Sequence, residues 1–101
     1  MKVLLINGSS RKDGCTGAAL KEVERALKEE GIETEIFFIG NAPMPDCIAC
    51  RKCKKTGECI FHDIVNEFVE KAKTADGFVF GSPVYFAHPS GRLLTFMDRA
   101  F

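Results

Sequence analysis

The chain lacks an excess of charge of either sign, a long apolar run, internal repeats and low-complexity segments. Its 14 basic and 14 acidic side chains give a formal net charge of zero at pH 7. General binders of nucleic acid or of anionic membranes need a positive surface, so we expect neither partner. The apolar run Val3–Ile6 is four residues long, too short to cross a membrane or to form the core of a secretory signal. We therefore expect a soluble, cytoplasmic protein.

Apolar residues are plentiful, at 46% of the chain, which is enough to form a buried core and more than disordered segments contain. A length of 101 residues allows one domain at most. We therefore treat residues 1–101 as a single domain.

Apolar patterns along the chain alternate between those of strands and those of helices. Short apolar runs predict three strands, at residues 1–6, 32–38 and 78–80. Helical spacing predicts three helices, over 16–30, over 63–73 with Asp63 as its N-cap, and from Ser90 onward. This alternation predicts an α/β fold with a parallel sheet and helices on both faces.

Two loops, at 7–15 and 81–89, directly follow predicted buried strands. In open parallel sheets ligands bind beyond the carboxyl ends of the strands, so these loops should meet on one rim. The connection 41–57 is predicted to be long and irregular, a type of loop that is usually functional or disordered.

The first loop, Gly8–Thr16, has the composition of a phosphate site. Small residues let backbone amides approach an anion, hydroxyl groups and basic side chains add donors, and the helix N-terminus adds partial positive charge. The pattern is neither a Walker motif nor G-x-G-x-x-G, which disfavours ATP and a Rossmann-bound dinucleotide. The alternative is an ordinary polar turn in which Thr16 caps the helix.

Four of the five cysteines lie within thirteen residues, with the spacing Cys47-x2-Cys50-x2-Cys53-x5-Cys59. The odd total and the lack of a secretory signal argue against a disulfide framework. Bacterial ferredoxins begin their ligand run with the same C-x2-C-x2-C spacing. The spacing favours a 4Fe–4S cluster over a metal-free loop and over structural zinc, for which His62 could replace one thiolate.

The second loop carries the apolar and aromatic surface that a flat ring cofactor needs. Its candidate ring contacts are Pro83, Val84, Tyr85 and Phe86. The alternative is that these side chains only close the top of the core. His88, nearby, is a weak acid–base candidate.

Together these motifs resemble the NAD(P)H-dependent FMN reductases of flavodoxin-like fold, especially their iron–sulfur flavoprotein branch. The resemblance covers essentially all 101 residues. It is carried by the four-cysteine motif and by three further segments, Gly8–Thr16, Gly81–Tyr85 and Phe96–Arg99.

The resemblance implies a cofactor for each motif. The first loop would bind the FMN phosphate through Ser9, Ser10, Arg11, Gly14, Cys15 and Thr16, and the second loop would contact the isoalloxazine ring. The four cysteines would ligate a 4Fe–4S cluster that exchanges electrons with the flavin. NAD(P)H would donate hydride, and a small acceptor would take the electrons. No catalytic side chain is expected, because the flavin carries the hydride chemistry.

Relatives of this kind are dimers or tetramers whose subunits share flavin sites, so we expect a homodimer or homotetramer. Two positions depart from the family loop, in which a proline commonly stands where Ser10 lies and an asparagine where Cys15 lies. Cys15 forms poorer hydrogen bonds than asparagine and is expected to weaken phosphate binding.

The resemblance also implies a flavodoxin-like three-layer sandwich, with the strands in the order 2-1-3-4-5 in the complete fold. Only the part in the order 2-1-3 is present in this sequence, which would leave the strand at 78–80 as an apolar edge. We therefore expect residues 1–101 to be a C-terminally incomplete domain, or another chain to cover that edge.

Overall fold

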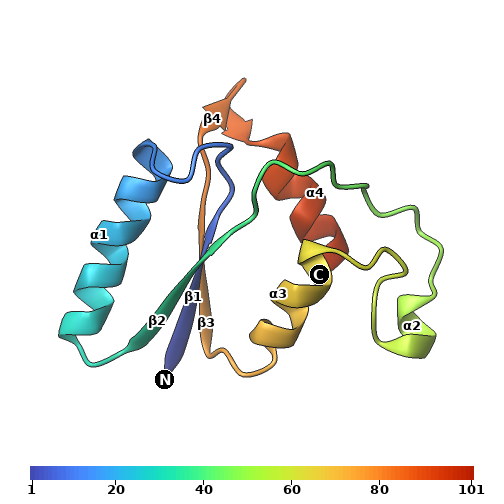
Figure 1. Ribbon diagram of the computed structural model, residues 1–101, viewed down its shortest axis with the longest axis horizontal. Helices are drawn as coiled ribbons and strands as arrows, with labels where there is room; N and C mark the ends of the chain where they lie inside the picture. Colours follow the sequence, from blue (N-terminus) through green and yellow to red (C-terminus); the bar gives the residue numbers. More distant parts are fainter.

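Three parallel strands form the centre of the computed structural model, which describes residues 1–101. They are β1 (Lys2–Asn7), β2 (Glu33–Phe38) and β3 (Gly77–Gly81), in the order β2-β1-β3 (Figure 1). In the register of the sheet, Leu4 pairs with Glu35 on one side and with Phe78 on the other. The α/β class, the parallel sheet and the 2-1-3 order are all as predicted.

Helices cover both faces of this sheet. Helix α1 (Cys15–Glu29) lies on one face, and α3 (Ile64–Ala72) and α4 (Gly91–Ala100) lie on the other. Side chains alternate along β1, so Leu4 and Ile6 pack with α3 and α4, whereas Val3 and Leu5 pack with α1. The continuous apolar run in β1 thus supplies both layers of the core.

Both predicted caps are present. The Asp63 carboxylate accepts a hydrogen bond from the Val65 amide at 3.1 Å, and Asn66 completes a capping box. The Ser90 hydroxyl accepts one from the Leu93 amide at 3.2 Å. Each cap fixes the first residue of its helix. These two helices in turn position the candidate sites.

The structure has two elements that the sequence did not predict. Helix α2 (Cys53–Thr56) lies inside the predicted irregular connection, and strands β4 (Val84–Tyr85) and β5 (His88–Pro89) form a hairpin inside the predicted second loop. The turn of this hairpin has φ angles of 50° at Phe86 and 64° at Ala87. Such turns normally carry Asn or Gly, so nothing in the sequence signals this one.

Strand β3 lies at the edge of the sheet, where it pairs only with β1. Its Phe78 side chain is exposed to solvent, so the expected apolar edge is present. That this edge is covered in the full-length protein stays a prediction. None of the helices is both long enough and apolar enough to cross a membrane.

Candidate functional site

The first loop is held in shape by the side chain of Asn7, the last residue of β1. Asn7 is buried, and its Oδ1 accepts a hydrogen bond from the Ser9 amide at 2.9 Å. Its Nδ2 donates to the Lys12 carbonyl at 3.3 Å, and the Ser9 hydroxyl accepts one from the Arg11 amide at 3.1 Å. One buried amide group therefore fixes both ends of the turn, a role that the sequence analysis missed.

Gly17, in the first turn of α1, lets the loop lie directly on the helix. A Cβ atom at this position would lie 2.3 Å from the Lys12 carbonyl oxygen, a separation that real Cβ atoms do not adopt. Only glycine is compatible with this close approach.

Apart from those of Ser9 and Arg11, the backbone amides of this turn have no partners within the chain. The set comprises Ser10, Lys12, Asp13, Gly14, Cys15, Thr16 and Gly17. Gly14 is the N-cap of α1 and no side chain caps the helix, so the alternative of a Thr16 cap is not observed. Free amides at the positive end of a fifteen-residue helix suit an anion such as a phosphate group. Arg11 and Lys12 are exposed beside them.

The second loop lies directly beside the first, as expected. The Gly8 amide donates to the Gly81 carbonyl at 2.8 Å, and the Ser90 hydroxyl donates to the Gly8 carbonyl at 2.9 Å. Ser82 strengthens the junction, since its hydroxyl accepts a hydrogen bond from the Ser90 amide at 2.8 Å. The two loops and the start of α4 therefore form one rim at the carboxyl ends of the strands (Figure 1).

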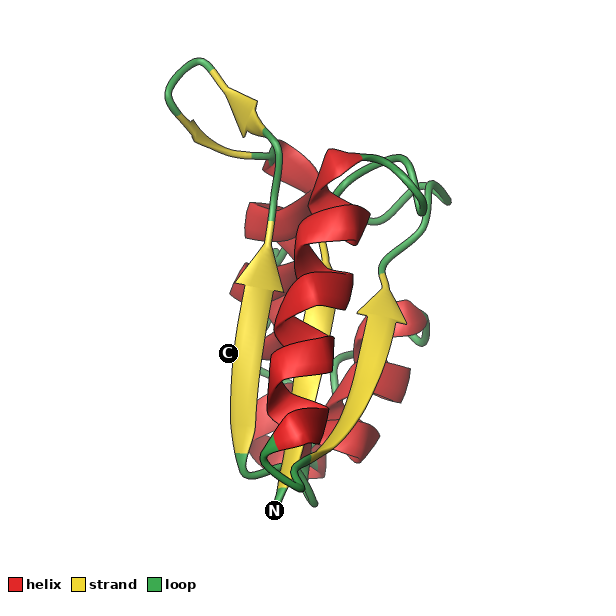
Figure 2. Ribbon diagram, turned by 90° about the vertical axis from the view of Figure 1, so that its left-hand side faces the viewer, coloured by secondary structure: helices red, strands yellow, loops and turns green.

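An exposed apolar hairpin projects from this rim. Figure 2 shows β4 and β5 extending beyond the end of the sheet. Val84 is 75% exposed, Tyr85 51% and Phe86 99%, whereas Pro83 is partly buried at the base. These side chains do not close the top of the core, which was the alternative considered, and they leave a free apolar surface next to the amides of the first loop. His88 lies at the base of the same turn and is exposed.

We predict that replacing Asn7 by alanine lowers the free energy of unfolding of the full-length protein by about 1–3 kcal/mol, because it leaves the buried Ser9 amide without a partner. Urea denaturation measures this. The matched control is Asn41→Ala, since Asn41 also holds this loop, by donating to the Ser10 carbonyl at 2.8 Å, but from an exposed position. Equal, small losses in both variants would contradict the organising role of Asn7.

All four clustered cysteines line one hollow of about 190 Å³. No three of the metal-ligating side chains of the chain lie close enough together there to hold a metal ion in this conformation. All four thiols are free, and only that of Cys59 is partly buried. His62 lines a neighbouring hollow with Cys53 and Cys59 and is not among the residues of this one.

Local backbone geometry brings the fourth cysteine back to the other three. Helix α2 begins at Cys53, and Gly57 ends it with a φ of 78°, so the chain reverses before Cys59. Between the first three cysteines, Ala49 and Arg51 have φ angles of 55° and 65°, and backbone strain of this kind occurs mainly at functional sites. The Ala49 amide also donates to the Cys47 sulfur at 3.4 Å.

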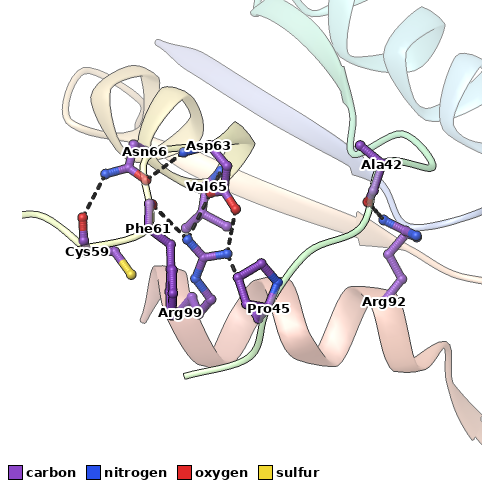
Figure 3. A network of polar contacts seen from close by, with 9 residues as sticks. All are labelled: Ala42, Pro45, Cys59, Phe61, Asp63, Val65, Asn66, Arg92 and Arg99. Atoms are coloured by element: carbon purple, nitrogen blue, oxygen red, sulfur yellow. Dashed lines mark hydrogen bonds and ion pairs between the residues drawn. The ribbon is translucent and has the colours of Figure 1, made fainter. Parts of the chain in front are cut away.

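Arg99, near the end of α4, fastens both ends of the cysteine segment (Figure 3). Its terminal nitrogens donate to the Asp63 carboxylate at 2.7 and 2.8 Å, to the Pro45 carbonyl at 3.1 Å and to the Phe61 carbonyl at 2.9 Å. Hydrogen bonding to Asp63 raises the pKa of Arg99 above its ordinary value, against the lowering effect of burial, and the neighbouring Cys59 sulfur raises it further. The guanidinium group therefore stays charged beside the hollow.

The rim and the hollow lie at opposite ends of α4. The helix begins at the rim with its Ser90 cap and reaches the hollow at Arg99, and ten residues of helix span about 15 Å. Figure 1 shows the cysteine segment running away from the rim, along the outer side of α3 and α4. Within one chain, the two candidate cofactor sites are therefore separate.

Known proteins match this chain along its whole length. The family model of the NADPH-dependent FMN reductases matches residues 1–101. An iron–sulfur flavoprotein of Methanocaldococcus jannaschii is 44% identical over 100 residues, which cover 99% of this chain and 52% of that protein. An iron–sulfur flavoprotein of Methanosarcina thermophila is 36% identical over 104 residues, with coverages of 99% and 52%.

A relative with a different name is the FMN reductase (NADPH) of Pseudomonas putida, which is 29% identical over 98 residues, covering 97% of this chain and 46% of that protein. The chain thus spans about half the length of the curated relatives it matches. Because the family match includes both rim loops and the 2-1-3 sheet that carries them, the chain belongs to the NADPH-dependent FMN reductase family.

Proposed function

We propose that the full-length protein is an FMN-dependent NAD(P)H oxidoreductase of the iron–sulfur flavoprotein type. It would move electrons between the nicotinamide, FMN and a 4Fe–4S cluster or a small external acceptor. The observation that carries this proposal is the rim, where unpartnered amides at the start of α1 lie beside an exposed apolar hairpin. A phosphate group and a flat ring need these two surfaces next to each other.

Both parts of FMN find suitable groups there. The free amides of Ser10 and of residues 12–17, the Ser9 and Ser10 hydroxyl groups, Thr16 and the exposed Arg11 side chain would bind the phosphate. Pro83, Val84, Tyr85 and Phe86 would contact the ring, and burying their apolar surface favours binding. Gly14 and Cys15 would contribute backbone amides, so the poor side-chain donor at Cys15 matters less than the sequence suggested.

The four cysteines that line the hollow, Cys47, Cys50, Cys53 and Cys59, are the donors that a 4Fe–4S cluster needs, and they would hold it once their thiols draw closer together. Four free thiols line one space, and Ala49 and Arg51, which lie between the first three, have left-handed backbone conformations. Four basic residues in the same segment, Arg51, Lys52, Lys54 and Lys55, would offset the negative charge of four thiolates.

When bound, FMN would accept hydride from the nicotinamide and the cluster would carry single electrons. The chain's own residues bind and orient these groups, and none is assigned a proton-transfer role. Because the rim and the hollow are separate within one chain, we propose a homodimer or homotetramer in which one subunit's hollow approaches another's rim. A cytoplasmic location, where thiols stay reduced, suits such a site.

The experiment is to purify the full-length protein without oxygen, measure its absorption spectrum and iron content, and then add NADPH or NADH. We expect a flavin band, about four irons per chain and bleaching of the flavin by at least one nicotinamide. Failure of both nicotinamides to bleach the flavin would overturn the oxidoreductase proposal. Bound metal without flavin would instead favour a non-enzymatic electron carrier. Bound flavin that stays oxidised would favour an inactive reductase domain.

A further inference from the structure

Arg99 carries the one buried side-chain nitrogen or oxygen in the chain that has no hydrogen-bond partner, its Nε atom. The side chain is completely shielded from bulk solvent. Its two terminal nitrogens, by contrast, are fully used by Asp63, Pro45 and Phe61. A buried charged group rarely leaves a donor unpaired, because desolvating that donor is unfavourable.

The unpaired donor belongs to the cysteine hollow. Arg99 lines this hollow together with the four cysteines. In Figure 3 the Cys59 sulfur lies on the side of Arg99 where the Phe61 side chain also lies. Cys59 also raises the pKa of Arg99, which agrees with both residues lining this hollow.

Three fixed contacts prevent Nε from turning elsewhere. The fork to Asp63 sets the plane of the guanidinium group, and the bonds to the Pro45 and Phe61 carbonyls hold it from two further directions. The guanidinium carbon also lies 5.2 Å from the centre of the Phe61 ring. Pro45 precedes Cys47 by two residues and Phe61 follows Cys59 by two, so the same group positions both ends of the ligand segment.

We propose that Arg99 is a positioning residue of the cysteine site, whose Nε–H donates a hydrogen bond to the Cys59 sulfur when that sulfur is bound to the cluster. The inference rests on the proposed function, because it needs the cluster. Hydrogen bonds to cluster sulfurs and nearby positive charge both stabilise the more negative, reduced state. Arg99 therefore raises the reduction potential of the cluster.

Lysine cannot replace this arrangement. Its ammonium group can pair with Asp63. However, lysine lacks the planar pair of terminal nitrogens and has no donor at the position of Nε. Arg99→Lys thus keeps a positive charge on α4 while removing the directed hydrogen bond to sulfur.

The first test is a redox titration of the cluster, followed by electron paramagnetic resonance, in full-length protein purified without oxygen. The matched control is Arg92→Lys, since Arg92 lies on the same helix and donates to the Ala42 and Asn41 carbonyls at 2.9 and 3.3 Å, away from the hollow. We expect Arg99→Lys to disfavour reduction by about tenfold or more, a shift of about 59 mV to more negative potential for one electron. Arg92→Lys should keep the wild-type potential, and equal potentials in all three proteins would overturn the inference.

A second test needs no change at Arg99, so it holds even if Arg99→Lys fails to fold. Protein labelled with ¹⁵N-arginine is reduced, and pulsed electron paramagnetic resonance measures nitrogen coupling to the cluster. Arg51 is the other arginine that lines the hollow, so Arg51→Lys is measured alongside. We expect ¹⁵N coupling in both proteins, and its absence from the wild type or its loss in Arg51→Lys would overturn the inference.

The two tests also separate this inference from the proposed function. Protein that contains no iron would overturn both. Protein with a full cluster, but with no arginine coupling and no change of potential in Arg99→Lys, would overturn the role of Arg99 alone.

Discussion

Replacing Gly17 by alanine is expected to weaken FMN binding to the full-length protein by about tenfold or more, or about 1.4 kcal/mol. Helix propensity alone predicts that this change stabilises the protein, since alanine is more favourable than glycine in a helix interior by about 1 kcal/mol. Here the added methyl group would lie 2.3 Å from the Lys12 carbonyl oxygen, so the loop must move off the helix. Overpacking of this kind costs about 1–3 kcal/mol, enough to outweigh the propensity.

Titration of FMN into apoprotein, followed by flavin fluorescence, measures the affinity, and urea denaturation measures the stability. Gly91→Ala is the matched control, because Gly91 begins α4 and a Cβ atom there would have no heavy atom within 4 Å. The control should bind FMN like the wild type and be equally or slightly more stable. Unchanged affinity in Gly17→Ala would show that the close approach of loop and helix does not shape the phosphate site.

The elements that could be predicted are those specified by neighbouring residues. The apolar run of β1 is buried on both faces, and the caps Asp63 and Ser90 bond to amides two and three residues away. Cysteine spacing is equally local, and all four thiols line one hollow, but that they ligate a cluster stays a prediction. In each case the physical cause lies within one turn or one short segment, where a pattern in the sequence can reveal it.

The functional residues that the sequence did not reveal act through contacts with residues far away in the sequence, or through contacts that no local pattern predicts. Arg99 bonds to Pro45 across 54 positions and to Asp63 across 36, so no local pattern assigns its partners. Gly17 matters because the preceding loop folds back and brings the Lys12 carbonyl close to it, which only the folded chain reveals. Asn7 does carry a signal in the sequence, namely a polar residue that ends a buried strand directly before a glycine.

Replacing Cys50 by alanine is expected to reduce the iron content of the anaerobically purified, full-length protein from about four atoms per chain to nearly none. Loss of one thiolate leaves the cluster with an open coordination position. The FMN content should stay at the wild-type level, because the rim lies at the opposite end of α4 from the hollow. Iron analysis and the flavin absorption of the same sample measure both quantities.

Unfolding cannot account for this expected loss of iron, because the Cys50 side chain is exposed and makes no hydrogen bond. Truncating such a side chain usually changes stability by less than about 0.5 kcal/mol. The matched control is Cys15→Ala, which removes the one cysteine outside the hollow, at the start of α1. It should keep its full iron content, whereas full iron in Cys50→Ala, or equal losses in both variants, would contradict the ligand assignment. The pair of variants therefore tests whether the cysteine hollow and the rim bind their cofactors independently, as we expect from their separation along α4.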